Sequence, residues 1–183
     1  MGCAQSWVQE QGDGDKTLPW LPNDEMVTRA NSERAGSAQC MYLLNQVAIF
    51  KKLNGEDVSE LPYAVRPYQI ERAELNLDGT WDFIALIYQA QLFEKLNGGS
   101  PTVKDFPTTD KMKEWAAGNR KGACSARKAL NEQAMIQRVG GSEPAQLPYG
   151  LEDVLRGRAG MNIDGTWDFQ AIINQEAMWK KLQ

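Results

Sequence analysis

Apolar residues recur along the chain at intervals of three and four, the spacing that puts side chains on one face of an α-helix. In the first such stretch the apolar positions are Cys40, Leu44, Val47, Phe50 and Leu53. The stretch from Phe83 to Leu96 repeats this spacing. The long stretches run into a glycine, which suits the left-handed conformation that commonly ends a helix. These glycines are Gly55, Gly98 and Gly141. The pattern predicts an all-α protein whose long helices each turn one apolar face to a core.

The chain repeats itself every 43 residues. The segments that align without gaps at this spacing begin at Leu44, Ile87, Leu130 and Ile173. The same offset brings four alanines and four glycines into register. They are Ala30, Ala73, Ala116 and Ala159, and Gly36, Gly79, Gly122 and Gly165. Identical residues in register at a fixed period indicate a structural repeat, in which each unit is one supersecondary element.

The units alternate between two types. The sequence from Gly79 to Phe83 recurs from Gly165 to Phe169, which lies 86 residues later. The order is therefore A, B, A′, B′, a tandem duplication of an 86-residue pair. Each unit is predicted to be a helix–turn–helix hairpin in which a short helix precedes a long one. The short helices are expected over about Asp24 to Arg34 and from near Pro67, Asp110 and Glu152. Such units build a compact helical bundle or a short α-solenoid.

This repeat divides the chain into four parts. Residues 1–20 form an N-terminal arm and 21–98 hold units A and B, while 99–109 form a linker and 110–183 hold units A′ and B′. The repeated alanines are expected where the two helices of a hairpin approach each other closely. A larger side chain at such a contact would overpack it.

The turns of the B-type units resemble the middle of an EF-hand calcium loop. Counted from Glu74, the asparagine, aspartate and glycine residues fall at positions that this family uses. The candidate ligands are Asn76, Asp78 and Asp82, and their counterparts Asn162, Asp164 and Asp168. Loop position twelve, however, is Ala85 or Ala171 in place of the bidentate glutamate, which removes two oxygen ligands.

A turn followed by a helix start accounts for the same residues without a metal. Thr80 or Asp78 is expected to cap the long helix, and Asp82 complements the positive end of its dipole. Trp81 and Trp167 are expected in the core. We therefore favour a capping role for the acidic turns, with calcium binding as the alternative.

The chain begins Met-Gly-Cys-Ala-Gln-Ser, which fits the myristoylation pattern of Gly2 followed by a hydroxyl residue at Ser6. One myristoyl chain binds a membrane only marginally, so stable anchoring needs a second signal. The residues that follow are net acidic and do not supply a basic cluster. Cys3 is therefore the predicted palmitoylation site. Covalent myristate and palmitate are the expected groups, and no other cofactor is expected unless the acidic turns bind calcium.

Composition removes several classes of function. The formal net charge is −4 with both signs interspersed, so no basic face for nucleic acid is expected. The chain has no histidine, which excludes histidine-based triads and metal sites. Its three cysteines are too far apart for a zinc cluster. No apolar run is long enough to span a membrane, and no motif indicates an enzyme.

Together these features predict a non-enzymatic, lipid-anchored helical-repeat protein at the cytoplasmic face of a eukaryotic membrane. It would act as a scaffold or structural subunit, because stacked hairpins offer an extended surface to a protein partner. Two similar faces 86 residues apart suit a repetitive or dimeric partner. Aromatic candidates for these faces, at least half of them expected in the core instead, are Trp20, Tyr42, Tyr88, Trp115 and Trp179. The alternative is a degenerate calcium sensor with weak or lost binding. Four helix–loop–helix units behind an acylated N-terminus resemble the plan of the myristoylated calcium-sensor family.

Overall fold

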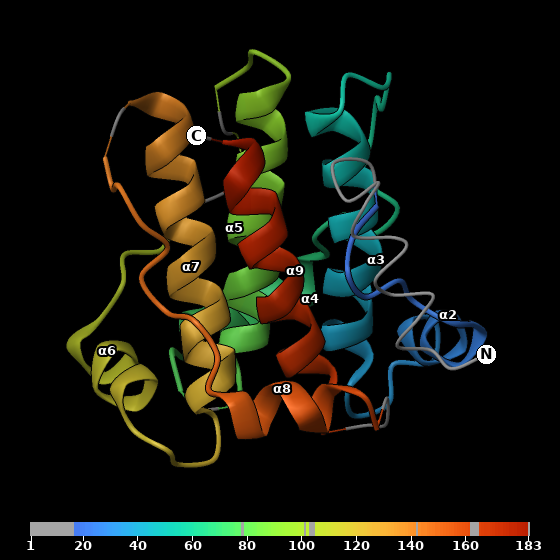
Figure 1. Ribbon diagram of the computed structural model, residues 1–183. Coiled ribbons are helices and arrows are strands. Elements are labelled where there is room, and N and C mark those ends of the chain that lie inside the picture. Colours follow the sequence, from blue (N-terminus) through green and yellow to red (C-terminus); the bar gives the residue numbers. More distant parts are fainter. Residues whose placement is uncertain are drawn as a thin grey trace.

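The computed structural model describes residues 17–77, 79–100, 102, 105–141, 143–161 and 165–182. Within these ranges the chain forms eight helices and no strand, in a compact arrangement, so the all-α prediction is confirmed (Figure 1). Short and long helices alternate. The short ones are α2 (Asp24–Ala30), α4 (Pro67–Glu74), α6 (Asp110–Ala117) and α8 (Asp153–Ala159). The long ones are α3 (Ser37–Leu53), α5 (Trp81–Leu96), α7 (Ala123–Gly140) and α9 (Trp167–Lys181).

Most helix boundaries agree with the sequence pattern. The exception among the short helices is α2, which ends at Ala30 because the side chains of Asn31 and Ser32 bond the last carbonyls of the helix. Gly55 and Gly98 have the expected left-handed backbone, with φ of 88° and 84°. The same prediction is wrong for Gly141. Helix α7 continues to Gly140, one residue further than the equivalent end of α3, and Gly141 has an extended backbone with φ of −172°.

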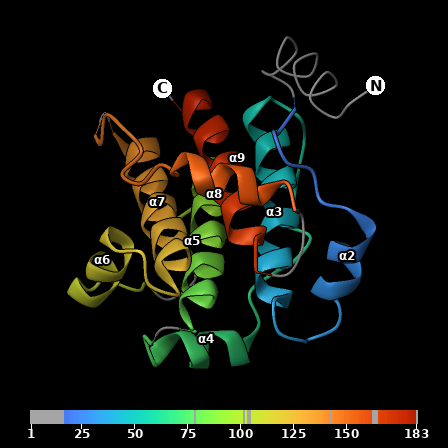
Figure 2. The same cartoon turned by 60° about the horizontal axis from the view of Figure 1, so that its bottom comes forward.

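The long helices are parallel and form a closed square. Helix α3 packs against α5, α5 against α7, α7 against α9, and α9 against α3. Residues near the ends of all four helices share one apolar cluster, whose members include Phe50, Phe93, Met135 and Trp179. A second cluster lies around the helix starts and includes the predicted core residues Trp81 and Trp167. Figure 2 shows the short helices arranged around this second end of the bundle.

The repeated alanines and glycines occupy equivalent places. Each short helix packs on the long helix that follows it. Ala30, Ala73, Ala116 and Ala159 are all buried, with exposed fractions of 0–1%. The glycines before the long helices have φ of 87° at Gly36, 98° at Gly79, 91° at Gly122 and 97° at Gly165. Only glycine adopts this conformation routinely, which accounts for its presence at the sharp entry to a long helix.

The apolar face predicted for the long helices is only partly correct. In α3, Cys40 and Phe50 are buried, but Leu44 and Val47 are half-buried and lie toward the outside. Asn45 and Gln46 are buried in their place. Helix α3 meets α5 on one side and α9 on the other, so its polar side chains are enclosed between neighbours. Polar side chains are therefore enclosed between the long helices midway along α3.

Four side chains of the long helices hold the extended segments that lead into the short helices. Asn45 accepts a hydrogen bond from the Tyr63 amide (2.9 Å) and donates one to the Tyr63 carbonyl (3.0 Å). The same pair of bonds joins Asn131 to Tyr149, and Asn174 to Trp20. In the remaining case the Tyr88 hydroxyl donates to the Phe106 carbonyl. The Asn174 contact joins the last long helix to the segment before the first short one.

Candidate functional site

A buried charged centre lies where the four long helices begin. The Lys128 ammonium of α7 is 2.8 Å from a carboxylate oxygen of Asp82 on α5 and 2.7 Å from one of Asp168 on α9. The Lys128 side chain is fully buried, and the two carboxylates are 18% and 12% exposed. Asp82 and Asp168, two of the predicted calcium ligands, thus lie on different helices and both contact one internal cation, the Lys128 ammonium.

Two neutral side chains complete this centre. The Gln39 amide donates to Asp82 at 3.1 Å and to Asp168 at 3.3 Å, and the Ser125 hydroxyl donates to Asp168 at 2.9 Å. Gln39, Asp82, Ser125 and Asp168 follow one another at intervals of 43 residues. Side chains 43 residues apart in sequence, one near the start of each long helix, therefore meet at the bundle axis.

The pKa values of the two aspartates in this centre shift in opposite directions. Burial raises the pKa of Asp82, but the Lys128 ammonium outweighs this and holds the pKa below its usual value. Burial keeps the pKa of Asp168 above its usual value, because the neighbouring charge of Asp82 offsets part of the attraction to Lys128. Burial would lower the pKa of Lys128, but the two carboxylates raise it. Each aspartate also lies in the first turn of its helix, where the helix dipole favours negative charge.

The other predicted ligands are differently placed. The Asn76 side-chain oxygen accepts a hydrogen bond from the Trp81 indole at 3.2 Å. Asp78, Asn162 and Asp164 lie outside the described residues, as do the lipidation residues Gly2, Cys3 and Ser6. Among the residues that the structure describes, no three acidic or cysteine side chains are grouped to hold a metal ion.

The predicted capping role of Thr80 is wrong in its detail. Thr80 does precede α5, but its side chain makes no capping bond to the helix. Its hydroxyl accepts from the Leu77 amide at 2.9 Å and donates to the Leu77 carbonyl at 2.7 Å, and so it closes the turn instead.

A second polar layer lies further along the axis, and the hydrophobic pattern did not predict it. Three glutamines in register donate to backbone carbonyls of a neighbouring long helix. Gln46 bonds Ala171, Gln89 bonds Tyr42, and Gln175 bonds Lys128, all at 2.8–2.9 Å. The fourth position of this register is Glu132. Recurrence of amide side chains at the repeat period was the signal that could have identified this layer.

Glu132 is the exception in that layer. It is fully buried and accepts a hydrogen bond from the Tyr42 hydroxyl through one oxygen. Its other oxygen has no hydrogen-bond partner in the described part of the chain. Burial raises the pKa of Glu132 to about 7. A protonated carboxyl could donate from this oxygen as the glutamines do.

A polar pocket of about 690 Å³ opens beside the charged centre. Its lining includes Asp82, Asp168, Ser125 and Cys124, together with Arg120, Lys121 and Arg158. Burial raises the pKa of the Cys124 thiol to about 12. The thiolate is the nucleophilic form of cysteine, so Cys124 is a weak nucleophile at neutral pH.

Five of the seven exposed large apolar side chains in the described part of the chain lie on α4, α8 and the turns that follow them, and the other two, Leu21 and Val27, lie just before and on α2. On α4 and the turn after it, Tyr68 and Leu75 are 36% and 57% exposed. Their counterparts 86 residues later, Val154 and Met161, are 70% and 57% exposed. We call each pair a B-type corner. The A-type units carry Glu25, Ser32, Lys111 and Gly118 at the same positions.

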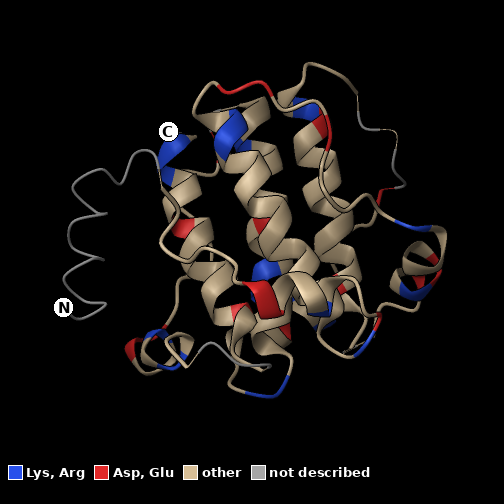
Figure 3. Cartoon of the chain, turned by 90° about the vertical axis from the view of Figure 1, so that its right-hand side faces the viewer, with Lys and Arg blue, Asp and Glu red and all other residues tan. Residues whose placement is uncertain are grey.

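Most of the aromatic residues predicted as candidates for a binding surface lie in the core. Tyr42, Tyr88 and Trp179 are buried, so for these three the alternative core assignment is the correct one. Trp20 and Trp115 are half-buried. Charged residues gather on the short helices and near the helix ends, whereas the long helices carry few along their length (Figure 3).

No helix within the described ranges is both long and apolar enough to cross a membrane. The chain matches no known protein family, and no similar curated protein or solved structure was found.

Proposed function

We propose that this chain is a lipid-anchored helical-repeat protein that acts as a non-enzymatic scaffold or structural subunit at the cytoplasmic face of a eukaryotic membrane. We further propose that it consists of four copies of one 43-residue helix–turn–helix unit, arranged as a duplicated pair. The observation that carries the scaffold role is the pair of exposed B-type corners.

The repeat proposal is supported by contacts that recur at the same spacing as the sequence. The buried alanines, the left-handed glycines and the side chains that hold the extended segments all fall 43 residues apart. Unrelated helices joined in one chain would have no reason to share these positions.

The scaffold role is supported by the location of the B-type corners. Exposed apolar side chains that lie together on one surface favour contact with a partner. Leu75 and Met161 have the same exposure on units separated by a full pair. Two such sites can engage two copies of a partner, or two sites of one assembly, with the gain that linked binding provides.

The scaffold role is testable with corner variants. Leu75→Ser and Met161→Ser should each weaken association with a bivalent partner, and the double variant should abolish it. Proximity labelling in cells compares the set of proteins labelled by the wild type with the set labelled by each variant. Glu71→Ser, an exposed substitution on α4, is the matched control. Labelling that is identical for the wild type and the double variant would contradict the corners as binding sites.

The anchor is proposed from the sequence around Gly2 and Cys3. Fractionation of eukaryotic cells that express Gly2→Ala or Cys3→Ser tests it. Gly2→Ala should move the protein to the cytosolic fraction, and Cys3→Ser should reduce membrane retention, because one acyl chain binds only marginally. Unchanged partitioning of both variants would refute dual acylation.

The calcium-sensor alternative receives less support from the charged centre. Asp82 and Asp168 already bind an internal ammonium, and displacing it would leave Lys128 buried beside a second cation. Titration calorimetry with millimolar calcium distinguishes the two proposals. We expect no heat of binding and no change in thermal stability.

A further inference from the structure

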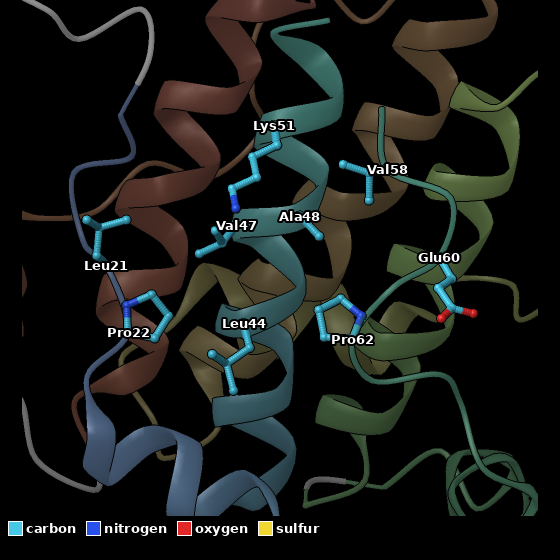
Figure 4. A pocket seen from close by; sticks show the side chains of 9 residues that line it. All are labelled: Leu21, Pro22, Leu44, Val47, Ala48, Lys51, Val58, Glu60 and Pro62. Carbon is cyan, nitrogen blue, oxygen red and sulfur yellow. The ribbon is translucent and has the colours of Figure 1, made fainter. Parts of the chain in front are cut away.

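An apolar groove runs along the outer face of α3. Its floor is formed by Leu44, Val47 and Ala48, and its walls are the extended segments on either side of the helix (Figure 4). Leu21 and Pro22 form one wall, and Val58 and Pro62 form the other. Lys51 and Glu60 are the charged residues among its lining. The groove is open to solvent along its length and has a volume of about 540 Å³.

The groove is most apolar in the first unit. The position of Val47 is occupied by Ala90, Gln133 and Glu176 in the other three units. In the last unit this position is also occupied by an ion pair, since Glu176 bonds Arg156 at 2.7 Å.

The wall of the groove differs in the same way. The position of Leu21, which is 53% exposed, is Ala64, Pro107 or Gly150 elsewhere. The first unit thus has the largest apolar side chain at this wall position, and at the position of Val47 only Ala90 is also apolar, with a smaller side chain. The repeat has diverged toward an apolar surface in the unit that directly follows the N-terminal arm.

We infer that this groove binds the myristoyl chain carried by Gly2, an inference that rests on the acylation proposed above. Leu21 and Pro22 lie only four and five residues after Thr17, where the described chain begins. About fifteen extended residues between Gly2 and Thr17 span roughly 50 Å. Helix α3 has 17 residues and is about 25 Å long, so the arm can bring Gly2 to any point along it.

Charge complementarity favours the same arrangement. The arm carries Glu10, Asp13, Asp15 and Lys16, and so it is net acidic. Lys51 extends from α3 along the groove, on the side that faces the arm-bearing wall (Figure 4). An arm folded back over α3 places its carboxylates near this ammonium.

Such a groove would control membrane attachment. A myristoyl chain held in the groove cannot insert into a bilayer at the same time. If the groove holds the chain in nine molecules of ten, the apparent membrane affinity falls about tenfold. Palmitoylation of Cys3 or binding of a partner near the groove would then shift the protein toward the membrane.

The test uses the full chain, myristoylated by co-expression with an N-myristoyltransferase and carrying Cys3→Ser so that one acyl chain is present. Binding to vesicles of pure phosphatidylcholine is measured by sedimentation. Leu21→Ser and Val47→Gln, the latter copying the residue of unit A′, should each raise the affinity up to about tenfold. Gln133→Val is the matched control at the equivalent position and should leave the affinity unchanged. Thermal melts establish that each variant folds.

A second measurement locates the chain directly. With a ¹³C-labelled myristoyl group, nuclear Overhauser contacts are expected to the methyl groups of Leu44 and Val47. If mass spectrometry finds no myristate on the co-expressed protein, the anchor and the groove assignment both fail. If the protein is myristoylated but both variants bind vesicles as the parent does, and the chain makes no contact with Leu44, only the groove assignment fails.

Discussion

The side-chain amide of Asn174 makes both hydrogen bonds of the Trp20 backbone, at 2.9 Å and 2.8 Å, across 154 residues of sequence. The first extended segment is therefore held by the last long helix in the way that Asn45 holds Tyr63. This contact adds to the closure of the square, in which α9 packs against α3, by joining α9 to the segment that precedes α2.

Asn174→Ala should lower the free energy of unfolding by about 1–3 kcal/mol, because it leaves a backbone donor and acceptor without their partners. Asn45→Ala, which removes the equivalent bonds, should cost a similar amount. Urea denaturation measures both. A negligible cost for Asn174→Ala beside a substantial one for Asn45→Ala would mean that the closure contributes nothing to stability.

Lys128→Met should destabilise the protein strongly, because two carboxylates would then face each other without their cation. Removing one partner of a buried ion pair lowers the free energy of unfolding by about 3–5 kcal/mol. Adding Asp82→Asn and Asp168→Asn to this variant should recover much of the loss. Exposed Lys113→Met on α6 is the control. If the triple variant were no more stable than Lys128→Met, the loss would come from packing and not from charge.

The pKa of Glu132 gives stability a defined dependence on pH. Its folded value of about 7 lies above the value of 4.5 for an unperturbed glutamate, so the folded state holds a proton that the unfolded state releases. Stability from this group is complete below pH 4.5 and is lost as the pH rises to about 7. The loss amounts to about 3 kcal/mol.

Glu132→Gln should remove this loss and make the protein more stable than the wild type at pH 8. Chemical denaturation at pH 5 and pH 8 gives the comparison. The matched variant Gln89→Glu, at the same position of unit B, should introduce a second loss over the same pH range. Equal pH dependence in wild type and Glu132→Gln would show that Glu132 is ionised in the folded protein.

The hairpin contacts predict that Ala73→Trp and Ala159→Trp each cost about 1–3 kcal/mol or fail to fold, because a large side chain overpacks a close helix contact. Both alanines are fully buried. Glu71→Trp, on the exposed side of α4, is the control for the bulk of the indole. Thermal unfolding followed by circular dichroism measures all three. Near-normal stability of both alanine variants would contradict the proposed hairpins.

Much of the fold was predictable because the local backbone conformation restricts which residues can start or end a helix. The starts of α4 and α6 at Pro67 and Asp110 follow from proline and acidic residues that suit a first helical turn. The glycines before the long helices follow from their left-handed backbone.

The polar axis could not be predicted in the same way. Hydrophobic spacing treats Asn45, Gln46 and Lys128 as surface residues, yet all three are buried. What buries them is contact between helices far apart in sequence, which one helix's own pattern does not contain. The convergence of Asp82 and Asp168 on Lys128 depends on the same contacts, and so the sequence of either acidic turn alone does not predict it.

The closed square of long helices also constrains how this protein can grow. An open stack of helical hairpins lengthens by adding units, provided that the end units present polar outer faces. Here α9 already covers the flank of α3, so a fifth hairpin would have to displace that contact and release Trp20 from Asn174. Gene duplication should therefore yield a second complete ring joined by a linker, and not a longer stack.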